Sequence, residues 1–170
     1  QGTGKFHNPE RIRITVGALV DLILKDIEDK WNCRLGRNCK RMATLKFRAY
    51  STQDWVLSTV LDAFGIREAA IGTDYMPRYN ALIAIELYEF EGKPSVKVLY
   101  RKHPRSDELS DLSSYVRWCE RDTIGCTFDR FTRCCNRYRS DNVTAICAQS
   151  RPPPFSRLYS WRKTQRLASA

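Results

Sequence analysis

The sequence predicts an α/β fold in which a mixed sheet containing a β-hairpin is flanked by helices. Three patterns support this prediction: a helical repeat of apolar residues over 12–27, a strand–turn–helix pattern over 44–64, and a hairpin pattern over 82–100. With 170 residues, of which 42% are hydrophobic and 28% charged, the chain is long enough to bury one core. We divide it into a folded region, residues 1–148, and a tail, residues 149–170.

The first helix is expected to begin at Asn8. Pro9 stands near the first helical position, and Glu10 places an acid in the first turn, both typical of a helix start. The apolar residues that follow recur at the spacing of one buried helix face: Ile12, Val16, Leu19, Val20, Ile23, Leu24 and Ile27.

A strand, a polar turn and a helix are expected in the next segment. Residues 44–50 alternate in polarity and are rich in strand-forming residues, and the polar turn 51–54 follows directly. Residues 55–64 form an apolar helix that Gly65 closes, because glycine adopts the left-handed cap conformation without strain. Ligands bind at such junctions of α/β sheets, where strand ends and helix-terminal N–H groups converge.

The hairpin comes next, with strands at 82–90 and 95–100 joined by a turn at 91–94 that contains Gly and Pro. A short amphipathic helix is expected to start at Cys126. In the tail, three consecutive prolines at 152–154 precede a basic stretch without acids, so we expect this segment to be flexible.

The seven cysteines predict disulfides rather than a metal site. No Cys-x-x-Cys pair occurs, and neither histidine, His7 or His103, stands beside a cysteine, whereas tetrahedral zinc sites take two ligands from one turn. No metal or cofactor is therefore expected. Adjacent residues do not bridge easily, so Cys134 and Cys135 are not expected to pair with each other. The odd count leaves one thiol free or paired with another chain.

A secretory route, ending outside the cell or in the lysosome, is expected. Asn142 begins an Asn-Val-Thr acceptor for N-linked sugar, among polar residues where a loop would expose it. Disulfides persist in the same compartments. No leader of charged and then apolar residues opens the sequence, so a secretory signal has been removed or was never present.

The net charge of +10 favours anionic partners such as phosphate. The basic residues are spaced rather than packed into one block, and no nucleic-acid-binding motif occurs, so specific nucleic-acid binding is not expected. No apolar run approaches the roughly 20 residues that cross a bilayer, so no transmembrane segment is expected.

An ordered set of short motifs resembles the carboxy-terminal half of the histidine acid phosphatases, branch 2 of the histidine phosphatase superfamily. Residues 50–57 read Tyr-Ser-Thr-Gln-Asp-Trp-Val-Leu, and 61–66 continue as Leu-Asp-Ala-Phe-Gly-Ile, which is similar to the family's Tyr-Ser-Ala-His-Asp strand end and following helix. Residues 4–10, the hairpin region 77–100 and Gly-Cys-Thr-Phe-Asp-x-Phe at 125–131 match further family segments in the same order. The resemblance covers residues 4–148 and implies part of a histidine-phosphatase-like α/β sandwich.

The resemblance implies a site at Gln53 and Asp54. In the family, an Arg-His-Gly histidine attacks phosphorus, arginines hold the phosphate, and the later His-Asp pair adds a cationic contact and a proton donor. This sequence contains no Arg-His-Gly, and Gln53 occupies the place of the second histidine, where a neutral amide can bind phosphate only weakly. Asp54 corresponds to the proton donor, but an Asp there also suits a helix cap, which we favour. The helix that starts at Cys126 resembles the family's disulfide-rich end. The disulfide candidates are Cys126 with Cys147, and Cys33 and Cys39.

Three functions remain open. The first is a degenerate or partial acid phosphatase that binds phosphate or another anion without hydrolysing phosphomonoesters. The second is a fragment of an active secreted acid phosphatase, whose activity needs the missing Arg-His-Gly half. The third is a basic interaction module that acts through the tail 149–170. A half-domain would also expose a sheet edge and apolar helix faces, so we expect either that disulfides and local repacking compensate or that a protein partner covers them.

Overall fold

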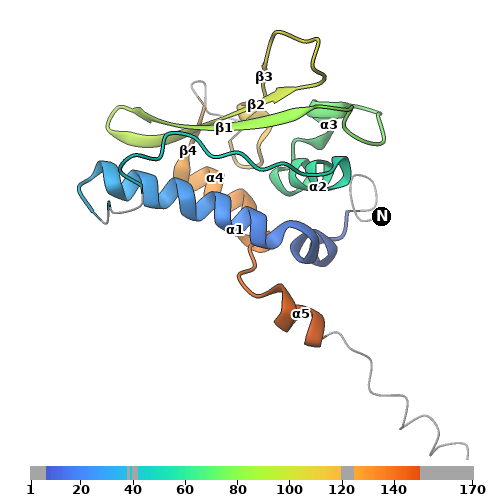
Figure 1. The fold of residues 1–170 in the computed structure, drawn as a ribbon, viewed down its shortest axis with the longest axis horizontal. Helices are drawn as coiled ribbons and strands as arrows, with labels where there is room; N and C mark the ends of the chain where they lie inside the picture. The colour runs from blue at the N-terminus through green and yellow to red at the C-terminus, as the bar shows by residue number, and fades with distance from the viewer. Residues whose placement is uncertain (1–6, 38, 40–41, 120–124, 150–170) are drawn as a thin grey trace, which may run out of the picture.

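The computed structural model describes residues 7–37, 39, 42–119 and 125–149 (Figure 1). Its main elements are helices and an antiparallel sheet, so the predicted α/β class is confirmed. Residues 150–170, which make up almost all of the expected tail, lie outside the described part of the chain. The helices are α1 (Pro9–Arg34), α2 (Asp54–Phe64), α3 (Arg67–Ile71), α4 (Phe128–Cys135) and α5 (Val143–Gln149), with 3-10 turns η2 (Ser113–Tyr115) and η3 (Asn136–Tyr138).

The first helix begins as predicted and runs further than its apolar stripe. The side chain of Asn8 accepts hydrogen bonds from the backbone N–H groups of Glu10, at 3.0 Å, and Arg11, at 3.2 Å, and so caps α1. Pro9 occupies the first turn, where its missing N–H costs nothing. The buried face contains five of the seven predicted stripe residues: Ile12, Val16, Val20, Leu24 and Ile27.

Helix α2 ends at Gly65 as predicted. Gly65 has φ of 78°, in the left-handed region, and the backbone N–H groups of Gly65 and Ile66 bond back to Asp62 and Leu61. The last seven residues of α2 are buried, and Phe64 packs against Phe131 of α4 with ring centroids 5.3 Å apart. The carboxyl end of α2 is therefore fixed in the core, whereas its amino end is exposed.

The predicted hairpin is confirmed, with a tighter turn than expected. Strands β1 (Leu82–Phe90) and β2 (Lys93–Arg101) pair from Leu82–Arg101 to Phe90–Lys93. Only Glu91 and Gly92 form the turn, both with positive φ, which is the geometry that two-residue hairpins require.

Every described strand pairing is antiparallel. β2 also pairs with β3 (Ser110–Asp111) and with β4 (Cys126–Thr127). The expected strand at 44–50 is wrong, because this segment forms no ladder with any described strand, and the parallel component of the expected mixed sheet is missing with it.

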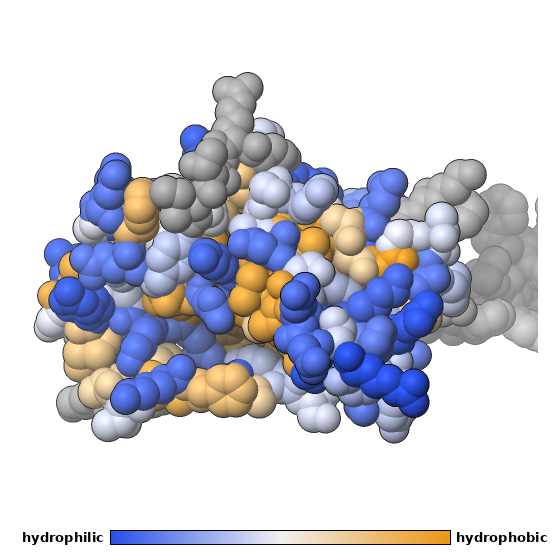
Figure 2. Space-filling view, turned by 90° about the horizontal axis from the view of Figure 1, so that it is seen from above, coloured by the Kyte–Doolittle hydropathy of each residue, from blue (hydrophilic) through white to orange (hydrophobic). Residues whose placement is uncertain are grey.

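One face of the sheet packs on the helices, and the other faces outward. Figure 1 shows α1, α2 and α4 beneath the hairpin. On β2, Val96, Val98 and Tyr100 alternate toward the core and are almost fully buried. No residue of β1 is fully buried. Figure 2, which views the molecule from above Figure 1, shows hydrophobic residues gathered in the middle of this side and bordered by hydrophilic ones.

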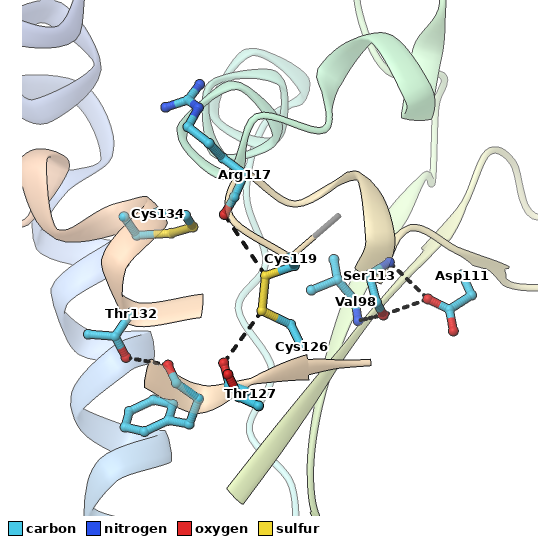
Figure 3. Close-up of a disulfide and its surroundings, with 11 residues drawn as sticks. Val98, Asp111, Ser113, Arg117, Cys119, Cys126, Thr127, Thr132 and Cys134 are labelled. Atoms are coloured by element: carbon cyan, nitrogen blue, oxygen red, sulfur yellow. Dashed lines mark hydrogen bonds between the residues drawn. A yellow bond between two sulfur atoms is a disulfide. The ribbon is translucent and has the colours of Figure 1, made fainter. Parts of the chain in front are cut away.

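Three disulfides lie within the described residues, and one expected pairing is wrong. Cys126 of β4 pairs with Cys119, with their Cα atoms 5.2 Å apart (Figure 3). It does not pair with Cys147, which lies exposed on α5. Pairing of β4 with β2 holds Cys126 beside the chain that leaves η2, and this chain carries Cys119. Cys33 pairs with Cys39 and closes the loop after α1.

The third disulfide joins the neighbours Cys134 and Cys135, against the expectation from their adjacency. Both side chains are buried at the end of α4, where the core confines the two sulfur atoms.

None of the described helices is long and apolar enough to cross a bilayer.

Candidate functional site

The predicted site lies where an extended segment meets the amino end of α2. Gln53 is the N-cap residue, with extended backbone at φ −84° and ψ 160°. Its carbonyl oxygen accepts hydrogen bonds from the N–H groups of Val56, at 3.1 Å, and Leu57, at 3.0 Å. The first turn of α2 is thereby closed by the backbone of Gln53, and its side chain is left for other contacts.

The side chain of Gln53 is exposed and bonded to a neighbour. Its carbonyl Oε1 accepts a hydrogen bond from the indole Nε1 of Trp55, whose side chain is itself 46% exposed. Its amide Nε2 makes no hydrogen bond to a described residue, so a neutral N–H donor remains at the amino end of α2.

Asp54 begins α2 and is exposed. Its carboxylate accepts a hydrogen bond from the backbone N–H of Trp55 at 2.7 Å. A carboxylate in the first turn also interacts favourably with the positive end of the helix dipole. Asp54 therefore stabilises the start of its own helix, and its role as a proton donor stays a prediction.

Neither histidine contacts Gln53 or Asp54. The Nε2 atom of His7 lies 2.9 Å from the hydroxyl of Tyr138, and its Nδ1 atom lies 3.6 Å from the carboxylate of Asp62. Asp62 follows Asp54 by about 12 Å along α2, at the usual rise per residue. His103 accepts a hydrogen bond from the backbone of Arg105 in the turn after β2.

The surroundings of His7 form a polar cluster that the sequence did not predict. Arg117 and Arg137 both donate to the hydroxyl of Tyr138, which is fully buried. The cluster joins the segment before α1 to α2, η3 and the chain that follows η2, so it fastens four parts of the fold together. Its residues are isolated polar residues from four segments that are far apart in the sequence. They follow no periodic pattern, so the sequence alone does not predict that they meet.

A second network joins α1 to the segment after η3. Asp21 is bonded to Lys25 at 2.7 Å and to Arg139 at 2.8 Å. Partial burial raises the pKa of the Asp21 carboxyl, but the hydrogen bonds from Lys25 and Arg139 outweigh burial and hold that pKa below its usual value. Asp21 is therefore ionised in moderately acidic solution.

The predicted sugar acceptor lies at the start of α5. Asn142 is exposed, and its Oδ1 atom accepts a hydrogen bond from the backbone N–H of Ala145 at 2.9 Å. Sequence analysis expected a loop here; the structure places Asn142 at a helix start, which asparagine suits as a cap. A hollow of about 610 Å³ adjoins it between α1 and α5, lined in part by Arg13 and Arg137.

No group of three metal-ligating side chains gathers within the described ranges. The structure thus places Gln53 and Asp54 together at one helix end. Asn142 and the cysteine pairs lie on other segments of the fold.

The chain is similar in sequence to proteins named putative acid phosphatases. It is 33% identical over 166 residues to a protein of Caenorhabditis briggsae named putative acid phosphatase 1, and 31% identical over 146 residues to the Caenorhabditis elegans protein of the same name. These matches cover 95% and 85% of the chain. No profile of a known protein family matches the chain.

The relationship is to part of a longer protein. The chain spans 38% of the C. briggsae relative and 34% of the C. elegans relative. Over most of its own length, the chain is thus similar in sequence to part of these proteins.

Proposed function

We propose that this chain is a partial, degenerate relative of the histidine acid phosphatases that binds phosphate or a similar anion and does not hydrolyse phosphomonoesters by itself. Its similarity to putative acid phosphatases supports the phosphatase relationship. The motif Tyr-Ser-Thr-Gln-Asp at 50–54 supports the histidine branch of these enzymes.

The observation that carries the proposal is the neutral, exposed amide of Gln53 at the amino end of α2. A family histidine at this place would offer a charge-assisted hydrogen bond, whereas Gln53 offers a neutral one. Removing such a contact weakens transition-state stabilisation by about 3 kcal/mol. The sequence also lacks the Arg-His-Gly nucleophile, and His7 and His103 make contacts elsewhere.

Weak anion binding is compatible with the same geometry. The amide of Gln53 and the amino end of an 11-residue helix both favour negative charge. Asp54 opposes it, because its carboxylate already occupies one N–H group. We therefore expect low affinity, and Asp54→Asn to strengthen it.

A second candidate function is one half of a two-part acid phosphatase. The observation that favours it is that the relatives are more than twice as long as the matched region. In that case the chain is a fragment or one half of an active enzyme, the nucleophile lies in the part of the protein that this chain does not span, and hydrolysis appears only when both parts are present.

A third function, a basic interaction module that acts through the tail 149–170, involves residues that lie almost entirely outside the described ranges. We propose a secretory route, which three disulfides and the exposed Asn142 support.

Thermal unfolding in rising inorganic phosphate tests the binding proposal. We expect the melting temperature to rise more in phosphate than in chloride of equal ionic strength. Gln53→Glu keeps the size of the side chain but adds a negative charge, so it should abolish the phosphate-specific rise. A rise of equal size in Gln53→Glu would place the binding elsewhere, and no specific rise would refute anion binding.

A further inference from the structure

Asn142, the predicted sugar acceptor, lines the hollow of about 610 Å³ between α1 and α5. Its side chain is exposed, and its Oδ1 atom caps α5 by accepting the hydrogen bond from the Ala145 N–H. N-linked sugars attach to the other side-chain atom, the amide nitrogen Nδ2. In that transfer Nδ2 gives up one hydrogen and bonds the anomeric carbon of the first sugar, and the lipid pyrophosphate that carried the oligosaccharide leaves with the proton. The cap on α5 can therefore stay in place when the sugar is attached.

The charged side chains around the hollow balance one another. Two acids and two bases line it: Glu10, Arg13, Arg137 and Asp141. Arg13 already donates to the carbonyl of Arg139 at 3.2 Å. Arg137 already donates to the hydroxyl of Tyr138. A phosphate in the hollow would meet two carboxylates as well as these engaged arginines, so the lining favours a neutral ligand that both donates and accepts hydrogen bonds.

The rest of the lining includes apolar surface. Pro9 comes from α1, and Ala145 and Ile146 come from α5. An N-acetylglucosamine unit has both kinds of surface, because its hydroxyl and acetamide groups form hydrogen bonds while its C–H groups and methyl are apolar. A hollow of this volume is large enough for a ligand of one or two such units.

Helix α5 depends on what it packs against. It has seven residues, fewer than the about 12–15 that an isolated helix needs to be stable in water. Figure 1 shows it below α1 and set off from the other helices. None of residues 143–148, whose burial the structure describes, is fully buried. A sugar that contacts α1 and α5 together would therefore strengthen a weak attachment.

From this arrangement we infer that the hollow between α1 and α5 is the seat of a glycan on Asn142, and that its first two N-acetylglucosamine units hold α5 against α1. Because the acceptor is itself part of the lining, the contact is intramolecular, and weak hydrogen bonds suffice to maintain it. The inference rests on the proposed secretory route. It does not depend on phosphate binding or on the loss of hydrolysis, so these proposals can fail separately.

Hydrogen exchange of the full chain, purified from a secretory host, tests the seat. Thr144→Ala removes the sugar but keeps Asn142 and its cap, and Thr144→Ser is the matched control because serine keeps the acceptor signal. The amides of α5 should exchange about tenfold more slowly in the wild type and in Thr144→Ser than in Thr144→Ala. Trimming the wild-type glycan to its first N-acetylglucosamine should keep part of this protection.

Substitutions in the lining distinguish a seated sugar from one that only projects into solvent. At least one of Glu10→Ala and Asp141→Ala should speed α5 exchange in the glycosylated chain and leave it unchanged when combined with Thr144→Ala. Glu28→Ala is the control, because Glu28 is exposed on α1 and outside the lining.

The outcomes separate the seat from the secretory route. A sugar on Asn142 with α5 exchange as fast as in Thr144→Ala would overturn the seat and leave the route standing. The seat would also be overturned by protection that neither Glu10→Ala nor Asp141→Ala reduces. A chain from the secretory host without a sugar on Asn142 would overturn the whole inference.

Discussion

Two adjacent residues decide the chemistry at the amino end of α2. The motif located Gln53 and Asp54 correctly at a helix start, because a polar turn before an apolar helix is a local pattern. Their contacts could not be predicted in the same way. The bond from Trp55 to the Gln53 side chain and the bond from the Trp55 backbone to Asp54 depend on rotamers that the sequence does not reveal.

Asp21 should make stability depend on pH in the acid range. Its folded-state pKa lies below the ordinary value of 3.8, so the folded chain binds fewer protons there than the unfolded chain. The stability that the ionised Asp21 carboxylate provides to the folded chain is therefore complete above about pH 5 and is lost as the pH falls through the lowered pKa. Asp21→Asn should cost about 1–2 kcal/mol near neutrality, and the difference from wild type should shrink as the pH falls below the ordinary pKa of 3.8.

Urea unfolding at a series of pH values measures this difference, with the exposed Asp107→Asn as the control. A difference between Asp21→Asn and wild type that stays constant down to the lowest pH would show that the ion pairs to Lys25 and Arg139 contribute nothing.

Asn142 should carry one N-linked sugar when the chain passes through a secretory pathway. Its side chain is exposed, and Oδ1 rather than the amide nitrogen is used to cap α5. Wild-type protein from a secretory host should lose the mass of one glycan on enzymatic deglycosylation. Asn142→Gln and Thr144→Ala should show no such loss, and a persistent loss in both would place the sugar elsewhere.

At the scale of elements, periodicity predicted most of what was correct. The stripe of α1, the glycine end of α2 and the β1–β2 hairpin each follow from residues close in sequence. The segment 44–50 has the alternation of a strand, and the structure keeps it extended, but a strand also needs a neighbour. Alternation reports which side chains face a surface and cannot report whether another chain segment lies alongside.

The prediction of the disulfide between Cys126 and Cys147 was wrong for a related reason. Cys126 is 21 residues from Cys147 and 7 from Cys119 along the chain, and pairing of β4 with β2 brings only the latter close. Spacing alone cannot distinguish these partners, because the choice depends on tertiary contacts.

The disulfide pairing has a direct consequence for stability. Replacing both Cys119 and Cys126 by Ser should lower the free energy of unfolding by about 2 kcal/mol, because it releases the chain after η2 from β4. Cys147→Ser should change it little, because Cys147 is exposed and outside the three disulfides. Chemical unfolding without reductant compares the variants, and a larger loss in Cys147→Ser would contradict the pairing.

At the scale of the whole molecule, one core joins α1, α2, α4 and the inner face of the sheet. The polar clusters around Tyr138 and Asp21 fasten the helices to one another. The α/β class was predictable because each major element carries its own pattern. The clusters were not, because their members come from segments up to 131 residues apart.

The central claim is that this chain does not hydrolyse phosphomonoesters by itself. The measurement that tests it most directly is release of 4-nitrophenol from 4-nitrophenyl phosphate at about pH 5 by the purified chain, beside Gln53→His and Asp54→Asn. We predict that all three proteins fold cooperatively and release no more product than buffer, because Gln53→His restores a charge but no nucleophile. Saturable turnover by the wild type that Asp54→Asn abolishes would contradict the account, and His7 and His103 would then be the nucleophiles to test.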